Sequence, residues 1–413
     1  MRVLIVTAGS WGDVAPFIGL GVRLRGAGHD VVLATHERFE EAVTVQGLGF
    51  RPLPVDPRQE LASQVGQGLA KAASPPAEMA RIMRMARAFM PRLAVGVADA
   101  VRAGADVVLS STVTDSLCAT LGEALRVPSM GAYLQPIQPT RAFPPMITGA
   151  RSFGSLGNRL AALALWAGTD RIFAPAVGAL RRELGLPPRR FGGPLGLPRG
   201  RTVLHGFSPT VVPRPADWPA GHEVCGYWWP QPPPDWRPDA RLADFLDAGP
   251  PPVFAGFGSF VTTEAERLSG LLAEAMRLAK VRGVVQAGWS GLHAESDDLI
   301  TVQDVPHAWL FPRTAAVVHH AGAGTTSAGL RAGTPAVPVP VQLDQHFWAA
   351  RLHTLGVAPR PLSYRRLTAR RLADALTAAV HDPGPRTRAG DLAGALARED
   401  GGRRVVAALD RLS

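Results

Sequence analysis

Short apolar runs alternate with amphipathic stretches along this chain. The run Arg2–Thr7 precedes a helical pattern over Pro16–Arg25, and a second β-branched run follows over Asp30–Ala34. Strands that read as continuous apolar runs are typical of parallel sheets, in which a helix connects each strand to the next. The same alternation restarts at Pro252–Phe257. The pattern therefore predicts an α/β protein with two doubly wound, Rossmann-like domains.

Length and proline content predict where these domains meet. A chain of 413 residues exceeds what one hydrophobic core usually holds. Residues 208–238 carry too many prolines for regular helices or central strands. We therefore expect an amino-terminal domain over 1–210, a proline-rich linker over 211–238, a second domain over 239–385 and a carboxyl-terminal helical segment over 386–413.

The most specific chemistry lies in the glycine-rich stretch that follows the apolar run Ala315–Val318. Glycines let the backbone turn tightly beside a ligand, and either Thr325 or Thr326 could cap the next helix. Amides at a helix start bind phosphate oxygens, and a nearby imidazole can add a hydrogen bond. The residues expected to contact a phosphate are His320, Gly322, Ala323, Gly324, Thr325 and Thr326. Of the histidine pair we assign the phosphate contact to His320, with His319 pointing into the structure.

Other parts of the second half extend this phosphate site. Asp344 and Gln345 follow the apolar run Ala336–Val341, where a carboxylate and an amide could grip vicinal hydroxyls. Ser259 follows the run Pro252–Phe257 and either binds a phosphate or only shapes the turn. The backbone near Val305 could bind the edge of a nucleobase. Trp309 could stack on that base or pack in the core.

Three motifs in this chain resemble those of the GT-B glycosyltransferases, in the branch that holds sterol glucosyltransferases and actinobacterial antibiotic glycosyltransferases. They are the loop Gly9–Pro16, the segment Val305–Pro312, and the string His319–Thr326 with Asp344-Gln345 downstream. They stand in the family's order and span most of the chain. The resemblance implies two domains facing across a cleft, with the acceptor bound by the first and the donor by the second. It also implies a last helix that crosses back to the first domain.

Asp13 is the candidate general base. Aspartate before a helix is commonly its N-cap, but Pro16 would then leave few amides to cap. The resemblance implies that the matching aspartate takes the proton from the acceptor hydroxyl. Its place near a helix start predicts a carboxylate that stays ionised at neutral pH, with some loss of basicity.

Three residues are candidates for acceptor contact: His36, Met83 and Phe143. His36 ends the second predicted strand, where a structural histidine is the plain alternative. Met83 lies on a methionine-rich helical face that could adapt to a bulky apolar ligand or pack in the core. Phe143 lies in a proline-rich stretch that resembles the acceptor loop of sterol glucosyltransferases.

The charge balance alters the picture little. A net charge of +10 would suit a nucleic-acid binder. However, only Lys71 and Lys280 are lysines, and the remaining 42 of 44 basic residues are arginines scattered among alanine, glycine and proline. A codon bias explains this composition at least as well as a phosphate-binding patch, and no aromatic residues are interleaved with the basic ones, so we predict no nucleic-acid partner. The positive potential could still attract an anionic nucleotide or a membrane surface, which leaves a peripheral membrane contact open. The sequence does not predict an oligomeric state.

Neither a metal nor another cofactor is expected. The chain has no Asp-x-Asp, and Cys118 and Cys225 show no metal-ligand spacing and are predicted to be buried, reduced thiols. The longest apolar run, Leu160–Ala167, is too short to span a bilayer. The start of the chain is typical of a buried strand rather than a signal peptide, so we expect a cytoplasmic protein.

Together these features predict an inverting glycosyltransferase. Its donor would be a UDP- or TDP-hexose, and its acceptor a hydroxyl of a lipophilic natural product, sterol or terpenoid. Two alternatives remain open: a catalytically silent protein that binds a nucleotide sugar, and a nucleotide-sugar epimerase of similar fold.

Overall fold

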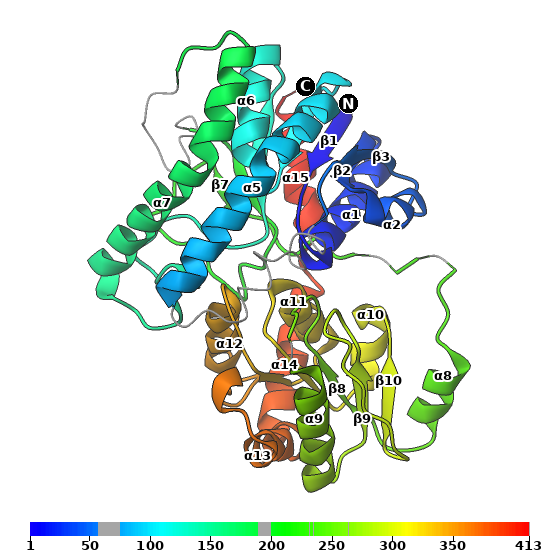
Figure 1. Cartoon of the computed structure of the whole chain (residues 1–413). Helices are drawn as coiled ribbons and strands as arrows, with labels where there is room; N and C mark the ends of the chain where they lie inside the picture. The colour runs from blue at the N-terminus through cyan, green and yellow to red at the C-terminus, as the bar shows by residue number, and fades with distance from the viewer. Residues whose placement is uncertain (57–74, 189–199, 231, 234, 263, 413) are drawn as a thin grey trace. The chain divides into compact units, whose positions relative to one another are not determined.

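The computed structural model describes residues 1–56, 75–230, 232–233, 235–262 and 264–412 apart from 189–199, with the backbone alone over 75–88. The chain forms two compact units, and each is described by itself (Figure 1). Unit 1 comprises Met1–Pro145, Ser152–Pro234 and Asp400–Ser413. Unit 2 comprises Met146–Arg151 and Asp235–Glu399.

Unit 1 is built on a sheet of seven parallel strands in the order β3-β2-β1-β4-β5-β6-β7. The strands are β1 (Arg2–Val6), β2 (Asp30–His36), β3 (Gly49–Leu53), β4 (Val107–Ser110), β5 (Ser129–Tyr133), β6 (Val203–His205) and β7 (His222–Val224). The accompanying helices are α1 (Trp11–Gly26), η1 (Glu37–Phe39), α2 (Glu40–Thr44), α5 (Pro75–Arg102), α6 (Asp115–Leu125), α7 (Gly154–Glu183) and α15 (Gly401–Asp410). Residues Val3 to Val6 of β1, an inner strand, are fully buried, which explains their unbroken apolar run.

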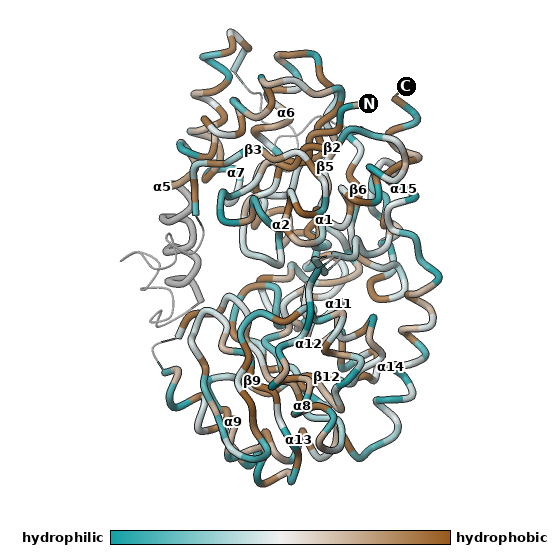
Figure 2. The backbone as a smooth tube through the Cα atoms, turned by 90° about the vertical axis from the view of Figure 1, so that its right-hand side faces the viewer, coloured by the Kyte–Doolittle hydropathy of each residue, from teal (hydrophilic) through white to brown (hydrophobic). Residues whose placement is uncertain are grey.

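Unit 2 repeats this design with five parallel strands in the order β10-β9-β8-β11-β12. The strands are β8 (Val253–Gly256), β9 (Gly283–Gln286), β10 (Leu299–Val302), β11 (Ala316–His319) and β12 (Ala336–Pro338). The helices are η2 (Met146–Thr148), α8 (Ala240–Asp247), α9 (Ala265–Ala279), α10 (His307–Leu310), η4 (Phe311–Arg313), α11 (Ala323–Ala332), α12 (Gln345–Thr354), η5 (Tyr364–Arg366), α13 (Ala369–His381) and α14 (Pro383–Leu396). In Figure 2 apolar segments, drawn in brown, run through the strands of each sheet, while teal segments lie mostly in the helices and loops. The two sheets confirm the predicted α/β class with two Rossmann-like units.

The strand order reverses at one place in each sheet. In unit 1 the reversal lies between β1 and β4, and in unit 2 between β8 and β11. Loops diverge at the carboxyl ends of strands at such a switch point, and open parallel sheets bind their ligands there. The loop after β1 leads to Asp13, and the loop after β11 holds His320. The topology therefore singles out the two loops that the sequence selected for chemistry.

The stretch 211–238 does not form the linker that the sequence predicted. Residues up to Pro234 belong to unit 1, and β7 adds a seventh strand to its sheet. The strand itself contains no proline, so its ladder hydrogen bonds are intact. Aromatic side chains hold the flanking segments: Trp218 stacks on His205 with ring centroids 4.6 Å apart, and Trp228 lies 5.5 Å from Phe17. Buried aromatic area thus outweighs the proline-based expectation of an extended connection.

The carboxyl-terminal helix α15 belongs to unit 1, whereas α14 stays in unit 2. Val405, Ala408 and Leu409 share a hydrophobic core with residues of α1. Asp400 pairs with Arg23 of α1 at 2.9 Å. The return to the first unit therefore begins at Asp400 rather than at residue 386, because α14 packs against α11 within unit 2.

Helix α7 is long and apolar enough to cross a membrane by length and composition, and most of its apolar stretch is not buried. This differs from the expectation that no stretch of the chain reaches that length. The expectation counted only the uninterrupted run Leu160–Ala167, whereas the helix extends that run on both sides. The core helices of soluble proteins can share this length and composition.

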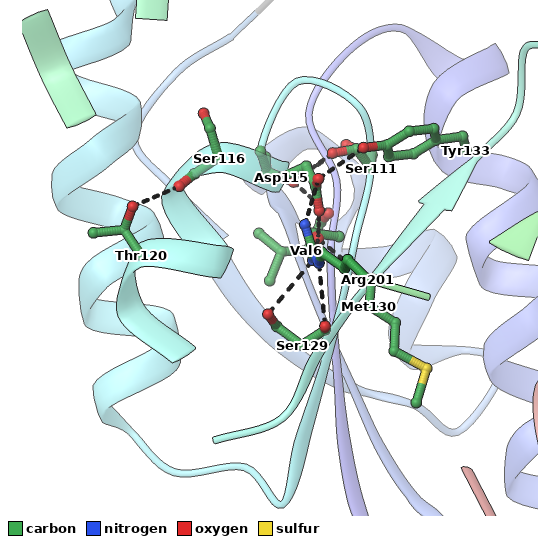
Figure 3. A network of polar contacts seen from close by, with 11 residues as sticks. Val6, Ser111, Asp115, Ser116, Thr120, Ser129, Met130, Tyr133 and Arg201 are labelled. Atoms are coloured by element: carbon green, nitrogen blue, oxygen red, sulfur yellow. Dashed lines mark hydrogen bonds and ion pairs between the residues drawn. The ribbon is translucent and has the colours of Figure 1, made fainter. Parts of the chain in front are cut away.

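A buried ion pair ties the layers of unit 1 together (Figure 3). Arg201 donates from Nη1 to Oδ2 of Asp115 at 2.5 Å, with side chains only 7% and 0% exposed. Tyr133 donates to the same carboxylate oxygen at 2.7 Å, and Ser110 donates to the other one. The Asp115 charge and burial together raise the pKa of Tyr133 well above its usual value, with burial the larger cause. A buried charge pair is held best where extra hydrogen bonds satisfy both partners, as they do here.

Both cysteines are free and buried, as the sequence predicted. Burial raises the pKa of Cys225 to about 12, so its thiol stays protonated. A thiolate is the reactive form of cysteine, and this side chain is therefore inert packing.

Candidate active site

Asp13 lies in the first turn of α1, three residues inside its N-cap Ser10. Its Oδ2 accepts hydrogen bonds from the Ser10 amide at 2.9 Å and from the Ser10 hydroxyl at 3.0 Å. Asp13 is therefore not the N-cap that the sequence left as the alternative. The helix begins at Trp11, because Ser10 has the extended backbone of a cap and Asp13 folds back to bind its amide.

The Asp13 carboxyl group is more basic than the sequence suggested. Burial raises its pKa above the ordinary aspartate value, although the two Ser10 hydrogen bonds oppose the shift. Its backbone is also fixed, since the Thr7 hydroxyl donates to the Asp13 carbonyl at 2.9 Å. A carboxylate with a raised pKa at a ligand-binding switch point is suited to accept a proton.

His36 lies behind this loop and not on an acceptor surface. Its side chain is 2% exposed. Nε2 accepts from the Gly9 amide at 2.8 Å, and Nδ1 donates to the Val55 carbonyl. The prediction of acceptor contact is wrong for His36, because both ring nitrogens are already bound within the protein.

The other two acceptor candidates remain predictions. The side chain of Met83, in α5, lies outside the described residues. Phe143 is half-buried in the loop after β5. That loop is anchored in unit 1, where Asp217 accepts from the Thr140 hydroxyl at 2.6 Å and from the Arg141 amide at 2.9 Å.

Trp11 is a residue to which sequence analysis gave no role. Its side chain is 49% exposed at the first position of α1, two residues before Asp13. The Phe39 ring packs against the Trp11 ring, with ring centroids 5.7 Å apart. The position of Trp11 beside the candidate base was visible in the sequence, but the exposure of its side chain was not.

In unit 2 the chain passes from β11 to α11 through a left-handed residue. Ala321 has φ +61°, and its amide donates to Nδ1 of the buried His319 at 3.1 Å. Directly after this residue α11 begins at Ala323, with Gly322 as its N-cap. The helix thus starts earlier than predicted, and neither Thr325 nor Thr326 caps it. His319 points into the core, as predicted.

The early helix start determines which amides are available to a ligand. The Thr326 amide bonds to the Gly322 carbonyl at 2.9 Å. The amides of Ala323, Gly324 and Thr325 precede this first helical bond, and such first-turn amides have no carbonyl partner within their own helix. Together with the helix dipole they form an anion-binding site.

His320 stands at the same end of α11 between two glycines. A Cβ on Gly322 would lie 2.5 Å from Nε2 of the ring, and a Cβ on Gly258 would lie 3.2 Å from Cε1. Gly258, in the loop after β8, also has φ +56°, which favours glycine. Residues of two loops at the switch point therefore lie against one imidazole: a Cβ at Gly322 would clash with the ring, and a Cβ at Gly258 would be in tight contact with it.

All three imidazoles in this part of unit 2 are neutral at pH 7. Burial lowers the pKa of His320 to about 4, against an opposing effect of the Gly256 backbone. Burial and then the charge of His320 lower the pKa of His319 to about 3 and of His307 to about 4. In the protein alone His320 is thus a neutral ring, and its single N–H group can donate one hydrogen bond.

Asp344 and Gln345 lie at the amino end of α12. Oδ2 of Asp344 accepts from the Trp348 indole at 2.9 Å. Oε1 of Gln345 accepts from the Val341 and Gln342 amides at 2.8 and 3.0 Å. The carbonyl oxygen of Gln345 therefore shapes the loop, which leaves its amide nitrogen as the group for a sugar.

The remaining donor-side candidates fare differently. Ser259 is half-buried directly after Gly258, and Val305 is half-buried before α10, so both remain predictions. Trp309 packs at 5.2 Å from Trp236, and the Arg313 guanidinium lies 4.4 Å from its ring centre. The structure thus favours the packed role for Trp309, because side chains already contact its ring.

Comparison with known proteins places these features in a family. Residues 3–142 match the family described as "Glycosyltransferase family 28 N-terminal domain". Residues 284–412 match the family described as "Erythromycin biosynthesis protein CIII-like, C-terminal domain". The O-mycaminosyltylonolide 6-deoxyallosyltransferase of Streptomyces fradiae is 37% identical over 97% of this chain and 95% of that protein. A sterol 3-beta-glucosyltransferase of Arabidopsis thaliana is 33% identical over 97% of this chain and 64% of that protein.

A solved structure supports the fold. The Streptomyces sp. SF2575 glycosyltransferase SsfS6, complexed with thymidine diphosphate, has a TM-score of 0.65 at 21% identity and covers 100% of this chain and 99% of that chain. At this identity the likeness bears on the fold alone. With the sequence relatives and the two switch-point loops, it leads to one conclusion: the chain belongs to the GT-B glycosyltransferases, in the family that joins antibiotic glycosyltransferases to sterol glucosyltransferases.

Proposed function

We propose that this enzyme transfers a hexose, with inversion, from a TDP- or UDP-sugar to a hydroxyl of a lipophilic polyketide, sterol or terpenoid. The observation that carries the proposal is the His320 imidazole, seated between Gly258 and Gly322 at the amino end of α11. This arrangement supplies a neutral N–H group and free helix amides to one anion, as the diphosphate of a nucleotide sugar requires.

On the donor side, these groups stabilise the leaving diphosphate. Negative charge builds on its oxygens as the bond to the sugar breaks. The His320 N–H and the first-turn amides of α11 are fixed before the reaction, so they gain strength as the charge develops. Because these groups stabilise the leaving group, we propose that no metal ion or other cofactor is needed.

The sugar ring is oriented from the amino end of α12. Asp344 accepts from sugar hydroxyls while Trp348 holds its carboxylate in place. Gln345 donates from its side-chain amide nitrogen. Such contacts convert a loose encounter into a geometry from which attack can proceed.

Asp13 acts on the acceptor. It takes the proton of the acceptor hydroxyl, and the resulting oxygen attacks the anomeric carbon. The bond from that carbon to the diphosphate oxygen breaks, and the diphosphate leaves with the electron pair. Attack opposite the leaving group inverts the anomeric configuration. The exposed Trp11 offers an apolar face for a lipophilic acceptor beside Asp13.

The relatives guide the choice of substrates. The chain spans 95% of the O-mycaminosyltylonolide 6-deoxyallosyltransferase but 64% of the plant sterol 3-beta-glucosyltransferase. The names of two solved structures of similar fold include thymidine diphosphate or dTDP. We therefore propose a TDP-sugar and a polyketide alcohol as the first pair to test, in a cytoplasmic enzyme.

The experiment incubates the protein with TDP- or UDP-glucose and a panel of polyketide and sterol alcohols, with EDTA present. It measures glycoside formation and nucleotide diphosphate release. Transfer by the wild type and its loss in Asp13→Asn are the expected results. Donor binding without turnover would instead indicate a silent binding protein, and a new nucleotide sugar without acceptor would indicate an epimerase. Transfer that EDTA abolishes and Mg²⁺ restores would contradict the metal-free scheme.

A further inference from the structure

His36 has a fixed tautomer that its two partners determine. The Val55 carbonyl can only accept, so Nδ1 carries the proton. The Gly9 amide can only donate, so Nε2 must be unprotonated to accept its hydrogen bond at 2.8 Å. A buried imidazole with both nitrogens satisfied holds its two backbone partners rigidly relative to each other.

Gly9 lies directly against the Asp13 side chain. A Cβ on Gly9 would lie 2.4 Å from Oδ2 of Asp13, and its φ of +149° favours glycine. The next residue, Ser10, donates both of its hydrogen bonds to that same Oδ2. Whatever holds Gly9 therefore also sets the place and the basicity of the Asp13 carboxylate.

We propose that His36 is a positioning residue for Asp13, acting through the Gly9 amide from the carboxyl end of β2. The assignment rests on the proposed role of Asp13 as the general base. His36 does not touch substrate. It holds the loop so that Ser10 can present the carboxylate to the acceptor hydroxyl.

The proposal requires a neutral imidazole. Protonation of Nε2 would set two N–H donors against each other and break the bond to Gly9. Burial lowers the pKa of His36, the Val55 hydrogen bond and the Asp56 charge oppose this shift, and the Arg38 charge adds to it. Arg38 and Asp56 also pair with each other at 3.6 Å, and Asp13 of α1 accepts from the Ser10 amide, next to Gly9 in the chain. His36 thus stays neutral at physiological pH and loses its function only on acidification.

Two substitutions separate positioning from mere packing. His36→Gln places an amide oxygen where it can accept from Gly9, whereas His36→Leu fills space without an acceptor. We expect His36→Leu to lower kcat about 10- to 100-fold, as small misplacements of reacting groups do. The KM of the donor and the affinity for TDP should stay unchanged, and His36→Gln should recover most of kcat.

The pH profile separates positioning from a purely structural role, because a purely structural residue would leave the shape of the profile unchanged. In the wild type, acidification protonates both Asp13 and His36, so kcat/KM for the acceptor should fall with the steepness of two protons. In His36→Gln only Asp13 is protonated on acidification, so the acid limb of the profile should have the steepness of one proton. Equal losses in the Gln and Leu variants, or a Leu variant with wild-type kcat, would overturn the proposal.

One further measurement needs no turnover, so its outcome does not depend on whether the proposed function is correct. Carbon-13 NMR of Asp13 should show a carboxyl pKa that differs between wild type and His36→Leu and returns toward the wild-type value in His36→Gln. If His36→Leu does not fold, His36→Ala takes its place, since it also removes the acceptor of the Gly9 amide, and it should shift the Asp13 pKa. An unchanged pKa in the folded variants would reject the positioning role even if no transfer substrate is found. An inactive wild type with the predicted pKa changes would reject only the proposed function.

Discussion

Trp348 donates its indole N–H to the Asp344 carboxylate at 2.9 Å, one helical turn away at the start of α12. Trp348 is fully buried, so the core fixes the position of this donor. The orientation of the Asp344 carboxylate is therefore fixed by the protein itself. This relationship leads to a direct test of the donor site.

Trp348→Phe should keep the aromatic packing and remove only the hydrogen bond to Asp344. A hydrogen bond to a charged group is worth about 1.5–3 kcal/mol, so we expect kcat/KM for the donor to fall about 10- to 100-fold. Steady-state kinetics with varied donor would measure this. Trp166→Phe is the control in unit 1, where the indole donates to the Ile137 carbonyl. A donor kcat/KM equal to that of the wild type would contradict the role of Asp344.

Gly322→Ala should displace His320, because the new Cβ would lie 2.5 Å from its Nε2. Loss of one preorganised donor to a developing charge costs about 100- to 1,000-fold in kcat, and His320→Ala should show a similar loss. Gly329→Ala is the matched control within the same helix, since the nearest atom to its Cβ would be 4.0 Å away. Rapid-quench measurement of transfer would distinguish the variants. Equal rates for both glycine variants would show that the ring position does not matter.

Ala321→Gly should stabilise unit 2. Ala321 adopts φ +61°, a conformation that strains a residue with a Cβ by about 1–2 kcal/mol, although glycine also gains entropy in the unfolded chain. The expected net gain is up to about 1 kcal/mol, read from the thermal unfolding of unit 2. Gly333→Ala tests the reverse case at φ +65° and should destabilise the same unit. A lower melting temperature for Ala321→Gly would show that the turn carries no strain.

Asp115→Asn should destabilise unit 1 strongly. The substitution leaves the Arg201 charge buried without its counterion, which typically costs about 3–5 kcal/mol. Glu183→Gln is the control, because the Arg102–Glu183 pair is 42% and 60% exposed and such surface pairs contribute about 0–1 kcal/mol. Urea denaturation followed in unit 1 would measure both. Similar losses in the two variants would contradict the importance of burial.

The raised pKa of Asp13 has opposite consequences for activity and for stability. The proposed role as general base requires the carboxylate, so kcat/KM should fall on acidification with an apparent pKa above that of an ordinary aspartate. The native state favours the protonated form, so the contribution of Asp13 to stability is lost as pH rises through its folded-state pKa. Asp13→Asn should therefore melt higher than the wild type at neutral pH, with a difference that shrinks in acid, while transfer falls about 100- to 10,000-fold. A pH-independent difference in melting would contradict the shift.

Much of the donor loop was predictable because its chemistry is local. The order His320, Gly322, Gly324 after an apolar strand reports the turn and the helix start within eight residues. The exact start of α11 was not predictable from the sequence. It depends on Ala321 adopting a left-handed conformation in which its amide donates to the His319 ring. That choice requires a buried His319, which no neighbouring residue specifies.

His36 and the stretch 211–234 show where local reasoning fails. His36 looked like a strand-end side chain open to a ligand, but Val55 and Gly9 come from distant parts of the chain and bind both its nitrogens. The proline-rich stretch looked like a linker, but its tryptophans pack onto the unit 1 sheet. In both cases partners far apart in sequence decided the outcome.

The sequence by itself determined the α/β alternation, the two sheets and the motifs, because hydrophobic period and turn chemistry act between near neighbours. Only the tertiary structure decided which polar atoms are already satisfied: Oδ2 of Asp13 by Ser10, Asp344 by Trp348, and His36 by its two backbone partners. Burial and hydrogen bonding across the chain set both the pKa and the availability of a side chain. Those quantities depend on contacts that form only when distant segments pack together.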